Sequence, residues 1–297
     1  MGGNIVLKDR NATRQADARP SFAFWYVFAS NGSDGFLLDL IRRPGESLAR
    51  MVTYKQGHPP RLVRHGFPSA GLNGVPGTLG VNLGGIALDA LGCRSTLPGM
   101  NLDARFALSG PSVRFAPRFV TWWFDSVPDF CSRYGVIERA TCDGAVYENA
   151  PVTCSTYSLD SLARARWVLI SAPRFAGTDL ALEISAARLL GRWMPAARVF
   201  HAGREYHLNS ALDSLLRLRI GRADDVGSGE PVFTASIRAR GLHLDVEARG
   251  PIDQFARLDA EGETEIHTTL FGTCRATVVS AGETFVAERN CLLEVKN

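Results

Sequence analysis

The chain of 297 residues has an ordinary globular composition, with 45% hydrophobic and 21% charged residues. This length predicts two domains by default, although one large β-domain is also compatible with it. The 33 basic and 30 acidic residues leave a formal net charge of +3. No run of lysine or arginine forms the basic footprint of a nucleic-acid-binding protein, so we expect no nucleic-acid partner.

The amino-terminal segment 1–20 is polar and mixed in charge, and it lacks the apolar centre of a signal peptide. No stretch approaches the roughly 18 uncharged apolar residues that span a membrane. The cysteines form neither a C-x-x-C motif nor a zinc-like pairing with histidine. We therefore expect reduced thiols, a cytoplasmic location and no metal. The six cysteines are Cys93, Cys131, Cys142, Cys154, Cys274 and Cys291.

Apolar and polar residues alternate with period two along most of the chain, which predicts an all-β protein. In segment 36–41, for example, residues 36, 38 and 40 share one face and Asp39 points the other way. Many short strands separated by turn residues favour sandwiches or barrels. Only 159–166 and 210–216 have short helical patterns. The candidate strands are 22–29, 36–41, 49–55, 61–65, 101–109, 113–124, 133–141, 165–172, 179–184, 197–201, 215–220, 232–240, 242–247, 270–279 and 284–295.

The glycine-rich segment 66–97 departs from this pattern. It superficially resembles a phosphate loop, but no Gly-Lys-Ser/Thr follows and no βαβ unit surrounds it. A loop, or a strand that crosses another backbone closely, fits the glycines better.

The two halves of the chain share a weak internal repeat. Each opens with a tryptophan-bearing strand, at 22–28 or 165–170, and continues with a strand that contains an acidic residue, Asp39 or Glu183. The repeat predicts two similar β-domains, residues 1–160 and 161–297.

Two near-motif segments resemble a known group. Segment 24–40, FWYVFASNGSDGFLLDL, is similar to the opening of the lipocalin-like proteins related to AttH, which turn through Asp-Gly and return on an apolar strand. The end, 270–279 followed by 283–295 with Glu294, resembles their closing hairpin. That group includes carotenoid 1,2-hydratases, tocopherol cyclases, and lipocalin-like Diels–Alderases and related cyclases.

The resemblance implies two lipocalin-like (calycin-type) β-barrel or sandwich domains side by side, with substrate in a pocket within or between them. It covers most of the chain in pattern and only the two ends in near-motif form. One tryptophan, Trp25, stands where a pair is usual, and Phe24 takes the preceding position. The Gly-His-x-Trp segment of hydratase-like members is absent from the sequence, which places cyclisation or isomerisation ahead of water addition.

Other catalytic classes lack their signatures. No G-x-S-x-G elbow and no nicotinamide-binding βαβ unit occurs. A two-carboxylate glycosidase stays open because sequence does not show separations. What remains is chemistry by pocket shape and a few polar groups, which orient a flexible substrate and move a proton or polarise a carbonyl.

The catalytic candidates are Glu183, Tyr134, Glu138 and His267. Glu183 lies on an Ala/Ser face of an otherwise apolar strand, so it is either a buried acid or a barrel-exterior carboxylate facing water. Tyr134 and Glu138 fall between the two halves, where an interdomain cavity would be lined. His267 follows Glu265 with the same facing and is a candidate for an acid–histidine pair.

The substrate-binding candidates are mainly aromatic. Neighbouring residues on a regular strand point to opposite faces, so one of Trp25 and Tyr26, and one of Trp122 and Trp123, would line a pocket. Tyr157 belongs to the region between the halves, whereas Arg204 and Tyr206 flank a hairpin turn at an expected barrel mouth. The substrate-binding candidates are Trp25, Tyr26, Trp122, Trp123, Tyr157, Arg204 and Tyr206.

The sequence thus predicts a cyclase or isomerase that acts on a hydrophobic polyene, terpenoid or polyketide-type molecule without metal or organic cofactor. The alternatives are a hydratase of an isoprenoid double bond and a non-catalytic carrier. A hydrophobic small molecule is the expected partner. Peripheral membrane contact to collect it, and a monomeric or homodimeric state, are both left open.

Overall fold

The structure is a computed structural model in which almost every element is a β-strand. All strand pairs are antiparallel, and a short 3-10 turn at Ser69–Gly71 interrupts the first sheet. The predicted all-β class is confirmed. The residues described are 23–43, 45–75, 77–114, 129–158, 166–175, 177–189, 192–209, 221–224, 231–239, 241–250, 256–260 and 264–296.

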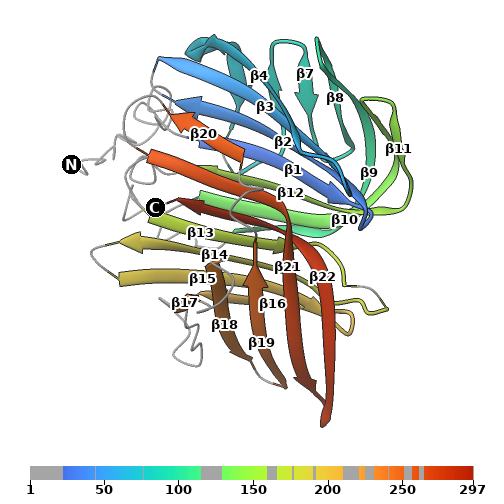
Figure 1. The fold of residues 1–297 in the computed structure, drawn as a ribbon, viewed down its shortest axis with the longest axis vertical. Helices are drawn as coiled ribbons and strands as arrows, with labels where there is room; N and C mark the ends of the chain where they lie inside the picture. Colours follow the sequence, from blue (N-terminus) through green and yellow to red (C-terminus); the bar gives the residue numbers. More distant parts are fainter. Residues whose placement is uncertain are drawn as a thin grey trace, which may run out of the picture.

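The first sheet contains twelve strands in the order β4-β3-β2-β1-β12-β10-β9-β8-β7-β6-β5, with β11 paired to β10 (Figure 1). Its strands are β1 (Ala23–Ser30), β2 (Asp34–Arg43), β3 (Glu46–Lys55), β4 (Arg61–Pro68), β5 (Leu72–Gly74), β6 (Val81–Leu83), β7 (Ile86–Leu88), β8 (Gly92–Leu97), β9 (Met100–Arg114), β10 (Asp129–Cys142), β11 (Ala145–Tyr147) and β12 (Ala150–Ser158).

The second sheet contains ten strands in the order β16-β15-β14-β13-β22-β21-β19-β18-β17, with β20 paired to β21 (Figure 1). Its strands are β13 (Arg166–Ala172), β14 (Ala181–Leu189), β15 (Arg192–His201), β16 (Arg204–Asn209), β17 (Gly221–Asp224), β18 (Pro231–Ala239), β19 (Leu242–Arg249), β20 (Ala256–Ala260), β21 (Thr264–Ser280) and β22 (Glu283–Lys296).

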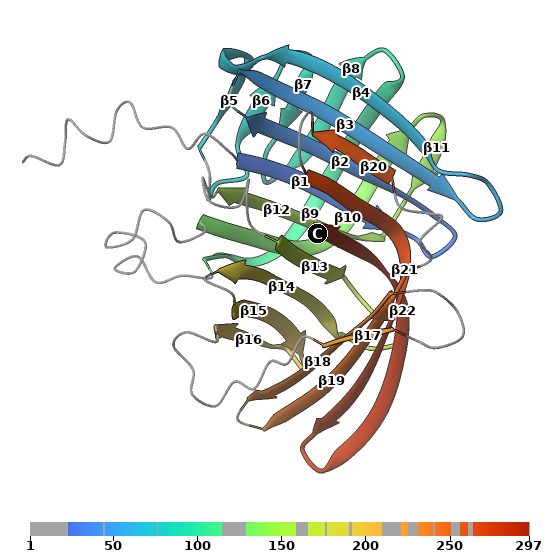
Figure 2. The ribbon, with the colours of Figure 1, turned by 60° about the vertical axis from the view of Figure 1, so that its left-hand side comes forward.

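Each sheet curves into a nearly closed barrel around its own apolar core (Figure 2). In the first barrel, side chains join the outer strand β4 to distant turns. His65 Nε2 lies 2.9 Å from the carbonyl oxygen of Pro98, and Arg61 forms an ion pair with Asp143 at 2.7 Å. These links run from one end of the sheet, β4, across to the β8–β9 and β10–β11 turns. The predicted pair of lipocalin-like units is confirmed.

The two barrels pack against each other through strands that are buried on both faces. All eight residues of β1 are buried. Trp25 and Val27 belong to the core of the first barrel, whereas Tyr26 and Phe28 point to the opposite face, where an outer barrel wall would normally meet water. A continuous apolar run is typical of strands covered on both sides.

Contacts across this face come from both barrels. The rings of Phe24 and Trp167 stack with centroids 6.0 Å apart. Ser171 Oγ on β13 donates a hydrogen bond to Thr153 Oγ1 on β12 at 3.3 Å. Figure 1 shows β13 of the second sheet running next to the first sheet, in agreement with the contact between β13 and β12. The outer face of the first barrel at β1 and β12 is therefore buried against the second barrel.

The glycine-rich segment 66–97 forms four short strands, β5 to β8, rather than one loop. Glycine is needed where this ribbon passes over the core: a Cβ at Gly74 would lie 2.9 Å from the ring of Trp25. The expected helices at 159–166 and 210–216, the strand 215–220 and the boundary between residues 160 and 161 fall wholly or largely outside the described residues. Among those described, no helix is long and apolar enough to cross a membrane.

Gly135 sets the close approach of β10 to β9, directly after a register shift between Ser132 and Tyr134. A Cβ at this position would lie 2.2 Å from the carbonyl oxygen of Ala107, and a backbone atom cannot move aside cheaply. We expect Gly135→Ala to lower the free energy of unfolding by about 1–3 kcal/mol because it overpacks the sheet. Urea denaturation measures this change.

Gly80→Ala is the matched control, because a Cβ at Gly80 would meet nothing within 4 Å. Its unfolding free energy should stay within about 0.5 kcal/mol of the wild type. Equal stability of the two variants would contradict the close packing at Gly135.

Candidate functional site

Glu183 is the centre of the polar cluster between the barrels. On β14 the residues Leu182 and Ile184 point into the core of the second barrel, so strand alternation turns Glu183 toward the first barrel. Its exposed fraction is 0%. Of the two sequence interpretations, a buried acid or a carboxylate facing water, the structure therefore shows the buried one.

Hydroxyl groups of the first barrel surround the Glu183 carboxyl group. The Tyr26 hydroxyl donates to Oε1 at 3.2 Å, and Ser132 Oγ donates to Oε2 at 2.7 Å. Ser155 Oγ donates to Ser132 Oγ at 2.7 Å and lies 3.4 Å from both carboxyl oxygens. Three strands, β1, β10 and β12, thus supply the hydrogen bonds that a buried carboxylate requires.

Arg198 on β15 connects this cluster to a neighbouring aromatic ring. It is 2% exposed, and its Nη1 donates to the carbonyl oxygen of Ser132. Its guanidinium carbon lies 4.6 Å from the ring centroid of Tyr134, a geometry typical of a cation–π contact. Arg198 therefore fixes both β10 residues, Ser132 and Tyr134, that flank Glu183.

Glu205 on β16 balances the charge of Arg198 and leads toward the surface. It forms an ion pair with the Arg198 Nε, and its second oxygen lies 3.4 Å from His207 Nε2. Partial burial acts to raise the pKa of Glu205, but the hydrogen bonds and charges of His207 and Arg198 outweigh it and hold the pKa below its usual value. Glu205 is therefore the anionic partner of the buried arginine at neutral pH.

A second buried ionic group lies on the same interface. Arg50 on β3 bonds Asp39 on β2 through Nε at 2.6 Å and also through Nη2. Its Nη2 lies 3.9 Å from Glu294 Oε1 on β22, in the other barrel. Burial raises the pKa of Asp39, and the Arg50 charge opposes the rise. This group ties the barrels together through Nε and Nη2 of Arg50.

The Glu183 cluster can perform acid–base chemistry. A carboxyl group shielded from water and held by hydroxyls can give or take a proton without first shedding solvent. In the described part of the chain, no three side chains among His, Cys, Asp and Glu come together as a metal-binding set.

Three sequence candidates meet in this cluster: Glu183, Tyr134 and Tyr26. Trp25 fills the core of the first barrel instead, where its ring nitrogen donates to the carbonyl oxygen of Thr78 at 2.8 Å. Glu138 is exposed on β10. A binding role for Trp25 or a catalytic role for Glu138 remains a prediction.

The other candidates lie away from the cluster or outside the description. Arg204 is exposed at the start of β16, and Tyr206 packs against the core of the second barrel. Candidates whose side chains fall outside the described residues are Tyr157, His267, Trp122 and Trp123.

The sequence interpretation missed Ser132, Ser155 and Arg198. Ser155 lies in the run Thr153-Cys-Ser-Thr156, and Ser132 lies between Cys131 and Arg133, so no alternation of polarity marks either serine. The sequence signal for this site was Arg198 itself, a charged residue in the apolar run Ala196-Ala-Arg-Val199. An arginine among small apolar residues on a strand indicates a buried ion pair or hydrogen-bond partner, because charged side chains are rarely buried unpaired.

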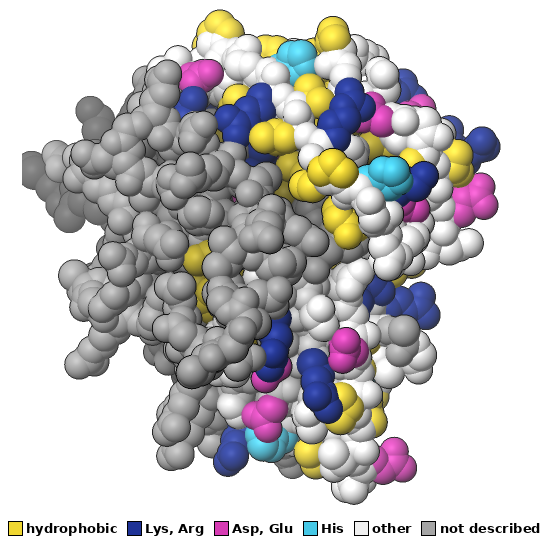
Figure 3. Space-filling view, viewed as in Figure 1, with side chains coloured by type: hydrophobic (Ala, Val, Ile, Leu, Met, Phe, Trp, Pro, Cys, Tyr) yellow, Lys and Arg dark blue, Asp and Glu magenta, His cyan; other side chains and the backbone are white. Residues whose placement is uncertain are grey.

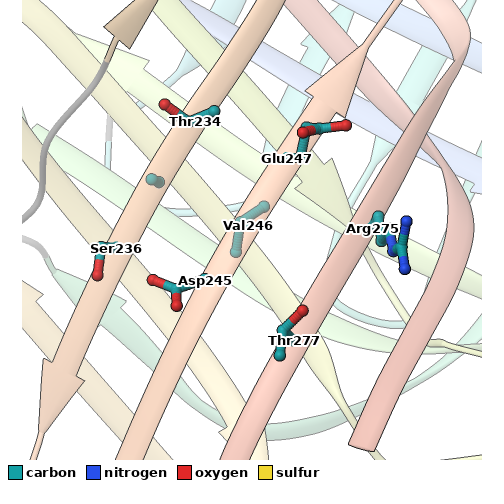
Figure 4. A pocket seen from close by; sticks show the side chains of 8 residues that line it. Thr234, Ser236, Asp245, Val246, Glu247, Arg275 and Thr277 are labelled. Carbon is teal, nitrogen blue, oxygen red and sulfur yellow. The ribbon is translucent and has the colours of Figure 1, made fainter.

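A hollow of about 480 Å³ lies on the outer face of β18, β19 and β21. Figure 4 shows the side chains of Ser236, Asp245 and Glu247 on two neighbouring strands at its floor. Its carboxylates already have partners: Glu247 pairs with Arg249 at 2.7 Å and Asp245 lies 3.3 Å from His243. Figure 3 shows charges of both signs scattered over this part of the described surface. The hollow carries no clear selectivity for a ligand.

The structure thus defines a double lipocalin-like barrel with a buried acid–hydroxyl cluster between its halves, and solved structures share that fold. A provisionally assigned AttH from Nitrosomonas europaea superposes with a TM-score of 0.56 at 14% identity, covering 99% of this chain and 98% of that one. Kievitone hydratase from Nectria haematococca superposes with a TM-score of 0.58 at 11% identity, and the match covers 93% of this chain and 88% of that one. CghA, solved with Sch210972, superposes with a TM-score of 0.57 at 11% identity, and the match covers 93% of this chain and 88% of that one.

No family model and no curated protein matches the sequence. The structural likeness therefore concerns the fold, which is the two-barrel fold of AttH-like proteins that the sequence resemblance predicted.

Proposed function

We propose that the protein is an enzyme that converts a hydrophobic small molecule at the contact between its barrels, with Glu183 as the proton-transferring group. The observation that carries the proposal is a carboxyl group with 0% exposure, held by Tyr26, Ser132 and Ser155 at the junction of two barrels. Ligand sites occur preferentially at domain interfaces. The shared fold with kievitone hydratase and with CghA, solved with Sch210972, supports a small-molecule substrate.

The reaction proposed first is cyclisation or isomerisation of a polyene, terpenoid or polyketide-type molecule without a cofactor. The stacked rings of Phe24, Tyr26 and Trp167 give the cluster an aromatic border. Such a border favours an apolar substrate and holds it in a reactive conformation. Glu183 then donates a proton to one carbon of the substrate and, as the carboxylate, takes a proton back from another, so that the product keeps the mass of the substrate and the acid is regenerated.

Hydration of a double bond is the second candidate, and the fold of kievitone hydratase favours it. In that reaction Glu183 protonates the alkene carbon or activates water, and the Ser155–Ser132 hydroxyl chain relays the proton. A carrier that binds its ligand unchanged is the non-catalytic alternative.

The mass of the product separates these three functions. Purified protein is incubated with linear polyene, terpenoid and polyketide-type substrates, and the extracts are compared by mass spectrometry with a boiled-protein control. A new compound of unchanged mass supports the cyclase or isomerase. A gain of one water supports the hydratase. A ligand that co-purifies unchanged, with no turnover of any substrate, overturns the enzyme and leaves the carrier.

A further inference from the structure

Tyr134 carries a hydroxyl group that the cluster does not use. The side chain is 5% exposed, and within the described protein its hydroxyl oxygen has no hydrogen-bond partner. The hydroxyls of Tyr26, Ser132 and Ser155 nearby are all engaged with Glu183 or with each other. Buried polar atoms without a partner are few in native proteins, and each calls for an explanation such as a catalytic role, an ordered water or a ligand.

The ring of Tyr134 is held in place. Strand β10 pairs on both sides, with β9 and with β12, so the backbone cannot turn the side chain away. The guanidinium of Arg198 lies over the ring, with its carbon 4.6 Å from the ring centroid, and Arg198 is in turn fixed by Glu205. The hydroxyl therefore keeps one direction, which is the property of a preorganised binding group.

The hydroxyl is a donor rather than an anion. Burial raises the pKa of Tyr134 well above its usual value, and the negative charge of Glu183 raises it further, against the opposing charge of Arg198. The carboxyl groups of Glu183 and Glu205 disfavour an anionic ligand beside the phenol. The neutral phenol presents its O–H as a donor, and a neutral carbonyl oxygen accepts it without adding charge to the cluster.

We infer that the Tyr134 hydroxyl donates a hydrogen bond to a neutral carbonyl oxygen of the bound ligand, so the substrate class is a carbonyl-bearing hydrophobic molecule rather than a pure hydrocarbon. The inference rests on the proposed function only in placing the ligand site beside Glu183. A hydrocarbon in the same place would leave the phenol as unpaired as it is within the described part of the free protein, so it would lack the hydrogen bond that a ketone gains. The rival explanation is a buried water on Tyr134 that no ligand replaces.

A matched pair of probes tests the inference without knowledge of the substrate. 2-Acetylnaphthalene and 2-ethylnaphthalene have nearly the same shape and differ by a carbonyl in place of a methylene. We expect the wild type to bind the ketone about 5- to 10-fold more tightly than the hydrocarbon, measured by fluorescence titration. In Tyr134→Phe this preference should vanish, while the affinity for 2-ethylnaphthalene stays equal or rises.

A stability measurement without ligand separates an unpaired phenol from one that binds water. Removal of an unsatisfied hydroxyl should leave the melting temperature of Tyr134→Phe unchanged or about 2 °C higher, whereas loss of a water-mediated bond should lower it. Tyr26→Phe is the matched variant, since its hydroxyl is bonded to Glu183, and its melting temperature should fall.

The outcomes distinguish this inference from the proposed function. A ketone preference that survives in Tyr134→Phe, or failure of the wild type to bind either probe, overturns the inference. A lowered melting temperature in Tyr134→Phe also overturns it, in favour of bound water. If the ketone preference depends on Tyr134 but no substrate is converted, the carbonyl site stands and the enzyme proposal fails.

Discussion

Glu183→Gln is expected to lower turnover by about 10²- to 10⁴-fold, the range that general acid–base groups contribute, with the fold retained. Glutamine has nearly the shape of glutamate. The hydroxyls of Tyr26, Ser132 and Ser155 can each rotate to accept from its amide, since a hydroxyl is both donor and acceptor. The change thus removes the acidic proton of the carboxyl group and little of the packing. It is measured as kcat on the substrate found by mass spectrometry.

The pH dependence adds a second readout to the same variant. If Glu183 transfers the proton, the wild-type pH–rate profile contains an ionisation that is missing from Glu183→Gln. Glu283→Gln at the exposed start of β22 is the control and should retain wild-type kcat. Full turnover in Glu183→Gln would show that the carboxylate only holds the barrels together, and the proton-transfer role would have to be abandoned.

The sequence predicted which way Glu183 points but not what it meets. Alternation with Leu182 and Ile184 places it on the outer face of the second barrel, and a period of two cannot say whether that face meets water or protein. The sequence signal that this face meets protein lay on another strand. The run from Phe24 to Phe28 is apolar on both faces, whereas the wall of a single barrel needs apolar residues only on its inner face.

The fold was accessible from the sequence because its strands carry strong local patterns. The segments 36–41 and 284–295 lie within β2 and β22, and the resemblance at both ends of the chain gave the pairing of barrels. The short strands β5 to β8 were not predicted because glycines interrupt the alternation of apolar and polar residues. Gly74 is one of these glycines, and a side chain at this position would collide with the Trp25 ring. Side-chain partners over long sequence separations, such as Arg198 with Ser132, depend on how the barrels dock and leave no periodic trace.

Arg198→Met is expected to lower the free energy of unfolding by about 3 kcal/mol, because it removes the cation of a buried network while its partners stay in place. The carbonyl of Ser132 would lose its donor, Glu205 its ion pair, and Tyr134 the charge over its ring. Urea denaturation measures the change, and Arg204→Met, at an exposed arginine of β16, should stay within about 0.5 kcal/mol. In a double-mutant cycle, Glu205→Gln should recover part of the loss, since the two groups share one contact. Strict additivity would mean that Arg198 and Glu205 do not stabilise each other, and then their ion pair would not be what holds Arg198 against Ser132 and Tyr134 beside Glu183.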